Sequence, residues 1–155
     1  MNIAVRKAEA HHVDGDGIAR FAAAILSAEG LDDETEVAIA FITNDEIAEL
    51  NETHMGKTGP TDVLSFPIED GTPGSPPRRA PDGPPVDLGD IFIATDVVTQ
   101  HAEQFQVGFE DELHLMVCHG LLHLLGWDHQ TDVEAEAMES REAMHLAAAG
   151  LVRRS

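Results

Sequence analysis

The chain has 155 residues and a formal net charge of −20, because 29 acidic residues outnumber 9 Lys and Arg. Its length suits one domain, and its content of 43% hydrophobic residues is that of a globular protein, which excludes a disordered chain. No apolar run approaches the roughly 18 residues that a membrane-spanning helix requires, and the N-terminus does not resemble a signal peptide. Because Cys118 is the one cysteine, no internal disulfide can form, and we expect a cytoplasmic protein.

The acidic charge bears on the partners of the protein. At ordinary ionic strength such a surface repels nucleic acid, whose binding relies on cations that displace counterions. One explanation is a partner other than nucleic acid. Another is a cytoplasm that holds molar salt, in which the Debye length shrinks to about 3 Å and the repulsion is screened. The scarcity of lysine, which occurs at positions 7 and 57 alone, favours the second explanation.

The hydrophobic pattern predicts an alternation of strands and helices along the chain. In chain order we expect a strand at Ile3 and Val5, a helix over residues 18–26, a strand over 37–42, a helix over 43–51, strands over 62–66 and 88–94, and helices over 95–106, 110–126 and 131–149. This order favours an α/β (α+β) fold, in which a small mixed four-stranded sheet packs against helices. We expect a single domain over residues 1–155, with a flexible loop in the Pro/Gly-rich stretch at 71–85.

Local signals mark several boundaries of these elements. Thr43 with Glu46, and Thr131 with Glu134, have the spacing of a capping box. Thr95 is expected to cap the third helix, and Pro67 places the strand before it at an edge of the sheet.

The stretch HGLLHLLGWDH at residues 119–129 holds three histidines. His119 and His123 are four residues apart, so on a helix they leave the same face one turn apart. Gly126 is expected to end this helix, so that the chain folds back and His129 approaches the other two. Three nitrogen ligands that leave a fourth position open are typical of a catalytic metal site, here on a central helix in a zincin-like arrangement. Zinc is the first choice, although nickel, iron and copper also accept imidazole ligands.

Gly120 stands where zinc proteases with this spacing carry a glutamate general base. Its presence disfavours peptide hydrolysis by that route. A bound metal can still lower the pKa of a water molecule to about 7, and the resulting hydroxide could attack a phosphodiester. We therefore predict metal-assisted hydrolysis and assign no side chain as catalytic base.

Other residues near the motif receive structural interpretations. Cys118 and His114 lie off the helix face that carries His119 and His123. We expect Cys118 to be a core residue and His114 to be a structural or supporting histidine. Asp128 either orients a histidine or shapes a turn, and Asp62 and Asp90 either line the cleft or cap a strand end. The histidines without partner spacing are expected at the surface, and these are His11, His12, His54, His101 and His145.

The motif HGLLHLLGWDH resembles the signature H-G-x-L-H-L-x-G-[YW]-D-H of the YbeY family of bacterial endoribonucleases. GPTDVLSFP at residues 59–67 and LGDIFIA at 88–94 also agree with the family, in order and spacing. The resemblance implies one Zn²⁺ per chain, held by His119, His123 and His129. It also implies cleavage of single-stranded RNA in 16S rRNA 3′ maturation and ribosome quality control. The implied partners are rRNA and the small ribosomal subunit, with no membrane or DNA partner.

The chain departs from the family at one position. Many members carry an aromatic–arginine pair shortly after the Leu-Asn that is here Leu50-Asn51, whereas this chain has His54 and Met55. A methionine cannot stabilise the charge of a phosphorane. Lys57 is the nearest cation and is the candidate RNA-binding residue, with a solvent-exposed loop lysine as the alternative.

The sequence is consistent with three functions. The first is a zinc-dependent endoribonuclease, which uses a zinc-bound water. The second is a non-enzymatic ribosome assembly factor with structural zinc, and the third is a zinc peptidase of related geometry.

The composition generates a prediction about salt. If the acidic surface is adapted to a high-salt cytoplasm, the free energy of unfolding should rise steadily as KCl increases to molar concentrations, because salt screens the mutual repulsion of the carboxylates. Chemical denaturation at a series of KCl concentrations measures this. Stability that is indifferent to salt would remove the high-salt explanation.

Overall fold

The computed structural model describes residues 1–7, 10 and 12–154, and its elements follow the predicted order of strands and helices. They are β1 (Asn2–Arg6), α1 (Gly15–Ala28), β2 (Glu36–Ile42), α2 (Asn44–Met55), β3 (Val63–Pro67), β4 (Asp87–Ala94), α3 (Thr95–Phe105), α4 (Phe109–Leu124) and α5 (Asp132–Ala148). Within these ranges no helix has both the length and the hydrophobicity to cross a membrane.

The four strands form one mixed sheet in the order β1-β2-β4-β3. β1, β2 and β4 are parallel to one another, whereas β3 runs antiparallel to β4. The predicted fold class is therefore confirmed. β3 lies at an edge, as expected for a strand that ends in Pro67, which has no N–H to donate to a further strand.

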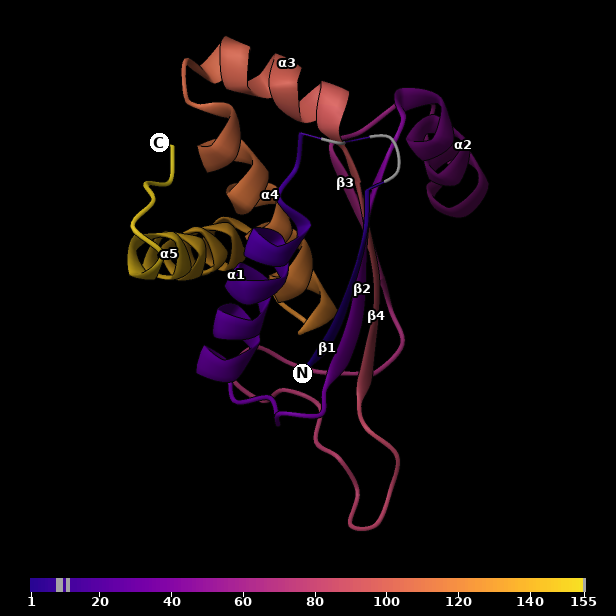
Figure 1. Ribbon diagram of the computed structural model, residues 1–155, viewed down its shortest axis with the longest axis vertical. Coiled ribbons are helices and arrows are strands. Elements are labelled where there is room, and N and C mark those ends of the chain that lie inside the picture. The colour runs from indigo at the N-terminus through magenta and orange to yellow at the C-terminus, as the bar shows by residue number, and fades with distance from the viewer. Residues whose placement is uncertain (8–9, 11, 155) are drawn as a thin grey trace.

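The helices cover the two faces of the sheet unequally. α1 and α4 lie on one face, and α2 lies on the other, near one end of the strands (Figure 1). α4 also packs against α1, α3 and α5, so it occupies the centre of the structure. Its buried residues accordingly occupy several sides of the helix, because neighbouring elements pack against it from more than one direction.

Local signals correctly predicted where α2 and α5 begin. Thr43 and Glu46 form the predicted capping box, in which the Glu46 N–H donates to Thr43 Oγ1 at 3.2 Å and the Thr43 N–H donates to Glu46 Oε1 at 3.1 Å. At the start of α5 the Glu134 N–H donates to Thr131 Oγ1 at 3.1 Å. α2 is longer than predicted, and it continues to Met55 before Gly56 ends it in a left-handed conformation.

Two other expectations concern the start of α3 and the Pro/Gly-rich loop. Thr95 was wrongly expected to cap α3, since it is the first helical residue and Ala94 precedes it without a side-chain cap. β4 passes directly into this helix, which leaves no intervening residue to act as a cap. The Pro/Gly-rich loop at 71–85 contains no helix and no named strand, and the connection that includes it projects beyond the end of the sheet (Figure 1).

Gly120 is a point of close contact between α4 and the sheet. A Cβ atom at this position would lie 2.9 Å from Cγ2 of Ile91 in β4 and 3.3 Å from Oγ of Ser65 in β3. The Ser65 hydroxyl donates to the Gly120 carbonyl at 3.2 Å, which joins the helix to the edge strand. The glycine is therefore required by packing, and there is no room for a glutamate side chain here.

This close approach predicts the effect of a methyl group at position 120. Overpacking costs about 1–3 kcal/mol, and the better helix propensity of alanine offsets about 1 kcal/mol of that. Because Ile91 is β-branched and stiff, we expect Gly120→Ala to lower the free energy of unfolding by about 1–2 kcal/mol in urea denaturation.

The matched control is Gly15→Ala. Gly15 is also helical, but a Cβ atom there would meet Lys7 and Val5 at ordinary distances of 3.5 and 3.6 Å. This variant should be as stable as the wild type or slightly more stable. A Gly120→Ala protein that matched it would contradict the packing described here.

Candidate metal centre

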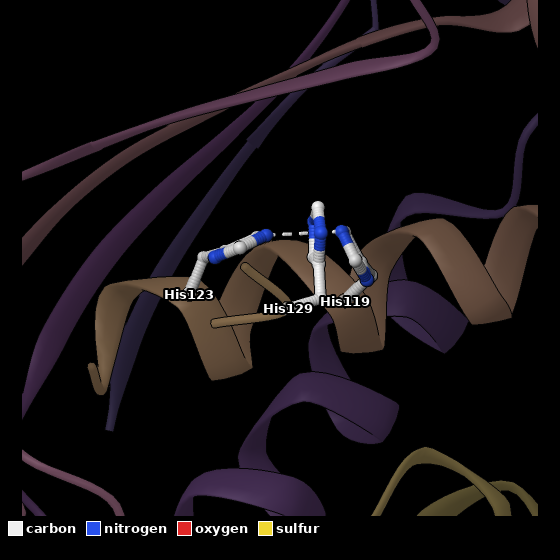
Figure 2. Close-up of side chains that lie close together, drawn as sticks. All are labelled: His119, His123 and His129. Carbon is white, nitrogen blue, oxygen red and sulfur yellow. Dashed lines mark hydrogen bonds between the residues drawn. The ribbon is translucent and has the colours of Figure 1, made fainter. Parts of the chain in front are cut away.

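His119 and His123 project from the same face of α4. Their Nε2 atoms lie 3.0 Å apart, and their ring centroids are separated by 4.5 Å (Figure 2). This geometry follows from their spacing, since residues four apart on a helix are neighbours on its surface.

The chain reverses direction immediately after α4. Gly126 has φ of +95°, and a Cβ atom there would collide with the backbone of Gly71. The Gly126 N–H donates to the His123 carbonyl at 3.0 Å, and the Trp127 N–H donates to the Leu122 carbonyl at 3.0 Å. A left-handed glycine with such bonds is a common helix terminus, and here it turns the next residues back toward the helix.

His129 returns to the other two histidines because of this reversal. The His129 N–H donates to Oδ1 of Asp128 at 2.8 Å, so Asp128 shapes the turn that carries the histidine. The ring of His129 lies 5.3 Å from that of His119 and 5.1 Å from that of His123, measured between centroids. One nitrogen from each ring lies within 4.8 Å of the others, so the structure brings the three predicted ligands together (Figure 2).

The arrangement fits a metal ion with an open coordination position. Burial, and then the neighbouring His119 and His129, lower the pKa of His123 to about 4, so its imidazole is neutral and able to bind a cation at neutral pH. His129 is exposed, and all three histidines line a cleft of about 620 Å³. Three imidazole nitrogens beside a cleft match the donor set of catalytic zinc sites, which keep one position for water or substrate.

Two residues that the sequence analysis missed support His119. Oε2 of Glu142, in α5, lies 2.7 Å from Nδ1 of His119, and Nε of Arg153 donates to Oε1 of Glu142 at 3.0 Å. Burial alone raises the pKa of Glu142, but the hydrogen bonds and charges of His119 and Arg153 outweigh it and hold the pKa below its ordinary value. One signal was available, because Glu142 falls on the same helical stripe as the apolar residues Met138 and Leu146.

The acidic residues singled out in the sequence have separate positions. Asp62 lines the same cleft as the histidines, where it accepts from the Val63 N–H at 2.9 Å and lies 3.3 Å from Nδ1 of His101. Asp90 instead lies within β4, opposite Phe66 of β3. Gly120 leaves no carboxylate beside the histidines at the position that proteases use.

The positions of Cys118 and of the histidines outside the motif agree with several predictions and contradict one. Cys118 is a buried core residue, and burial raises the pKa of its thiol well above the ordinary value. His114 packs edge-on against Phe21, as a structural residue does. His145 was expected at the surface but is 4% exposed, and its Nε2 lies 2.7 Å from Oε2 of Glu29 at the end of α1.

The remaining histidines are distributed around the metal centre and the surface. His12 and His54 are exposed, as predicted, and His101 is half-buried beside Asp62. The expectation for His11 lies outside the described residues. Lys57 is exposed and lines the histidine cleft together with Met55.

Comparison with known proteins identifies the family. A sequence profile of the family described as Endoribonuclease YbeY matches residues 4–150. Endoribonuclease YbeY of Alkaliphilus metalliredigens is 41% identical over 128 residues, which cover 83% of this chain and 79% of the relative. The Bacillus subtilis protein of the same name is 41% identical over 125 residues, or 81% of this chain and 79% of the relative. The solution structure of a Thermotoga maritima protein superposes with a TM-score of 0.62 at 25% identity, and covers 96% of this chain and 91% of that one. The resemblance seen in the sequence is therefore confirmed, and the chain belongs to the YbeY family of endoribonucleases.

Proposed function

We propose that residues 1–155 form one metal-dependent endoribonuclease domain, which cleaves single-stranded RNA with a zinc ion held by His119, His123 and His129. The observation that carries this proposal is the convergence of three imidazole nitrogens, within 4.8 Å of one another, at a cleft. Curated relatives at about two-fifths identity are named endoribonucleases, which supports RNA as the substrate.

The chain supplies binding and orientation, and the ion supplies the reactive chemistry. A zinc ion bound at the three histidines would polarise a phosphate oxygen and lower the pKa of a water molecule. Nε2 of His119 is turned toward His123 because Nδ1 of the same ring is held by Glu142. Since Gly120 is packed against β4, no carboxylate stands where zinc proteases place their base, and we assign no side chain to that role.

The cleft offers one cation to an RNA phosphate. Among the described residues that line it, Lys57 is the only lysine or arginine. Met55, at the end of α2, also lines the cleft and is 41% exposed, so an apolar side chain stands where the family pattern has arginine. We propose that Lys57 contacts the backbone of the bound RNA and supplies part of the positive charge that Met55 does not.

The biological setting extends this proposal. We propose that the substrate is the 3′ end of 16S rRNA, that the protein acts on the small ribosomal subunit, and that it does so in the cytoplasm. The net charge of −20 makes a local cation important for binding a polyanion. High salt in the cytoplasm would reduce the repulsion from the rest of the surface.

The alternatives receive less support. A zinc peptidase lacks its glutamate base at Gly120, and the packing leaves no space for one. A structural zinc site is normally closed by four protein ligands, whereas the three histidines here border a cleft of about 620 Å³.

Cleavage of a defined single-stranded RNA tests the metal centre. Metal ions contribute several kcal/mol to such reactions, and each 1.4 kcal/mol is about tenfold in rate, so we expect chelation or His123→Ala to slow cleavage at least about 100-fold. The assay compares zinc-loaded with chelated protein over a range of KCl concentrations. His12→Ala, which removes an exposed histidine outside the cleft, should leave the rate unchanged.

The same preparations separate the alternatives. Cleavage of casein without cleavage of RNA would favour the peptidase. His119→Ala tests the assembly factor, because a variant that loses the metal yet supports rRNA maturation in cells would contradict a catalytic role for the ion.

The role of Lys57 has its own test. Loss of one phosphate contact should weaken RNA binding and reduce the slope of log K against log salt by about 1. We therefore expect Lys57→Ala to raise KM for RNA several-fold while kcat changes little, and Lys57→Arg to restore KM. Arg20→Ala is the control, since Arg20 is an exposed residue of α1 that does not line this cleft. Equal KM values for Lys57→Ala and Arg20→Ala would contradict the assignment.

A further inference from the structure

Arg153, Glu142 and His119 form a continuous chain of contacts that ends at the metal centre. Nε of Arg153 donates to Oε1 of Glu142 at 3.0 Å, and the other oxygen of this carboxylate, Oε2, lies 2.7 Å from Nδ1 of His119. We propose that Arg153 and Glu142 are positioning residues, which fix the tautomer and ring orientation of His119 for metal binding. The proposal rests on the proposed function, in which His119 is a metal ligand.

The two nitrogens of His119 have different partners, and these partners determine the tautomer. An ionised carboxylate can only accept hydrogen bonds, so Nδ1 of His119 must carry the proton that Glu142 accepts. Nε2 then presents its lone pair toward His123, whose Nε2 lies 3.0 Å away. A lone pair on Nε2 is what a metal ion requires, and the opposite tautomer would place a proton there.

Glu142 needs both partners because of where it lies. The residue is 1% exposed, so water cannot satisfy its oxygens. A buried carboxylate oxygen without a partner is costly, and the side chain can avoid that cost by rotating toward another donor. Such a rotation would remove the acceptor from Nδ1 of His119. Arg153 prevents this because it pairs with the oxygen that His119 does not use.

The fold delivers Arg153 to this position by a reversal after α5. Gly150 has φ of +78°, and the Leu151 N–H donates to the Leu146 carbonyl at 2.8 Å, which turns the chain back along the helix. The guanidinium is then held from other sides as well. Nη1 donates to the Arg154 carbonyl at 2.7 Å, and Nη2 lies 3.8 Å from Oε1 of Glu139.

The neighbouring arginine provides a matched comparison. Nε of Arg154 donates to Oε1 of Glu112 at 2.7 Å, and Glu112 is a buried glutamate of α4. The guanidinium of Arg154 also lies 3.8 Å from the ring centre of Phe105. Both arginines therefore anchor the same C-terminal segment to a buried carboxylate, but only the carboxylate of Arg153 contacts a histidine of the metal centre within the described chain.

The first experiment measures the tautomer in metal-free protein without RNA. Long-range ¹H–¹⁵N correlation spectra at about pH 8, where ordinary imidazoles are neutral, report which ring nitrogen is protonated. His119 is assigned by the signals that disappear in His119→Gln. We expect the wild type and Arg154→Gln to show the Nδ1–H form, and Arg153→Gln and Glu142→Gln to show a mixture with the Nε2–H form.

The second experiment measures zinc affinity by competition with a chromogenic chelator. Loss of a group that orients a metal ligand typically costs 10- to 100-fold in affinity, so we expect about tenfold for Arg153→Gln and more for Glu142→Gln. Arg154→Gln should bind zinc as the wild type does. Since neither readout involves RNA, a protein that passed both tests but failed to cleave RNA would contradict the proposed function and leave the positioning role intact.

The comparison of the Arg153 and Arg154 variants decides whether the proposal stands. If Arg153→Gln and Arg154→Gln give the same His119 spectrum and the same zinc affinity, Arg153 only anchors the C-terminal segment. If Arg153→Gln does not fold, the comparison uses Arg153→Lys and Arg154→Lys, which keep the charge but lose the Nε donor. A change in the His119 signals confined to Arg153→Lys supports the proposal, and identical signals overturn it.

Discussion

The reversal of the chain at the end of α4 is the constraint on which the rest of the site depends. Two histidines on one helix can meet an ion from one side only, and a third ligand has to come from a different direction. Gly126 supplies that direction because it adopts a left-handed conformation and lies against the backbone of Gly71. Asp128 then holds the turn, so that His129 faces the helix from which the chain has just emerged.

The position of α4 explains why this small protein can hold such a site rigidly. The helix is enclosed by the sheet, α1, α3 and α5, so its backbone is fixed by packing on several sides. The buried glutamate of α5 reaches His119 across the interface between α4 and α5. His119 and His123 therefore stand on a helix that cannot shift without disturbing the core, and His129 lies on the turn that directly follows it, which is how functional sites keep their geometry.

Features determined by neighbours in the sequence were predictable, and features determined by distant partners were not. The pair of His119 and His123, the capping box of Thr43 and Glu46, and the glycine at the end of α4 are all local. Glu142 lies 23 residues from His119, and His145 lies 116 residues from its partner Glu29, so no spacing rule connects them. The misplacement of His145 has this cause, because a buried polar residue looks like a surface residue until its partner is known. The extent of the buried surface of α4 was also not predictable, since the pattern of apolar residues in a sequence does not show how many elements pack around a helix.

The tight contact at Gly120 also limits how this protein can evolve. A single nucleotide change converts the glycine codons GGA and GGG into glutamate codons, so a gene that uses either codon at this position is one mutation away from the motif of a zinc protease. In the folded protein this substitution requires a structural change, because the helix would have to move away from Ile91 and Ser65 before a larger side chain could fit. Natural selection for proteolysis would thus first have to rebuild the interface between helix and sheet, at a cost in stability before any new chemistry appeared. Packing, as much as the ligands themselves, separates the two kinds of enzyme.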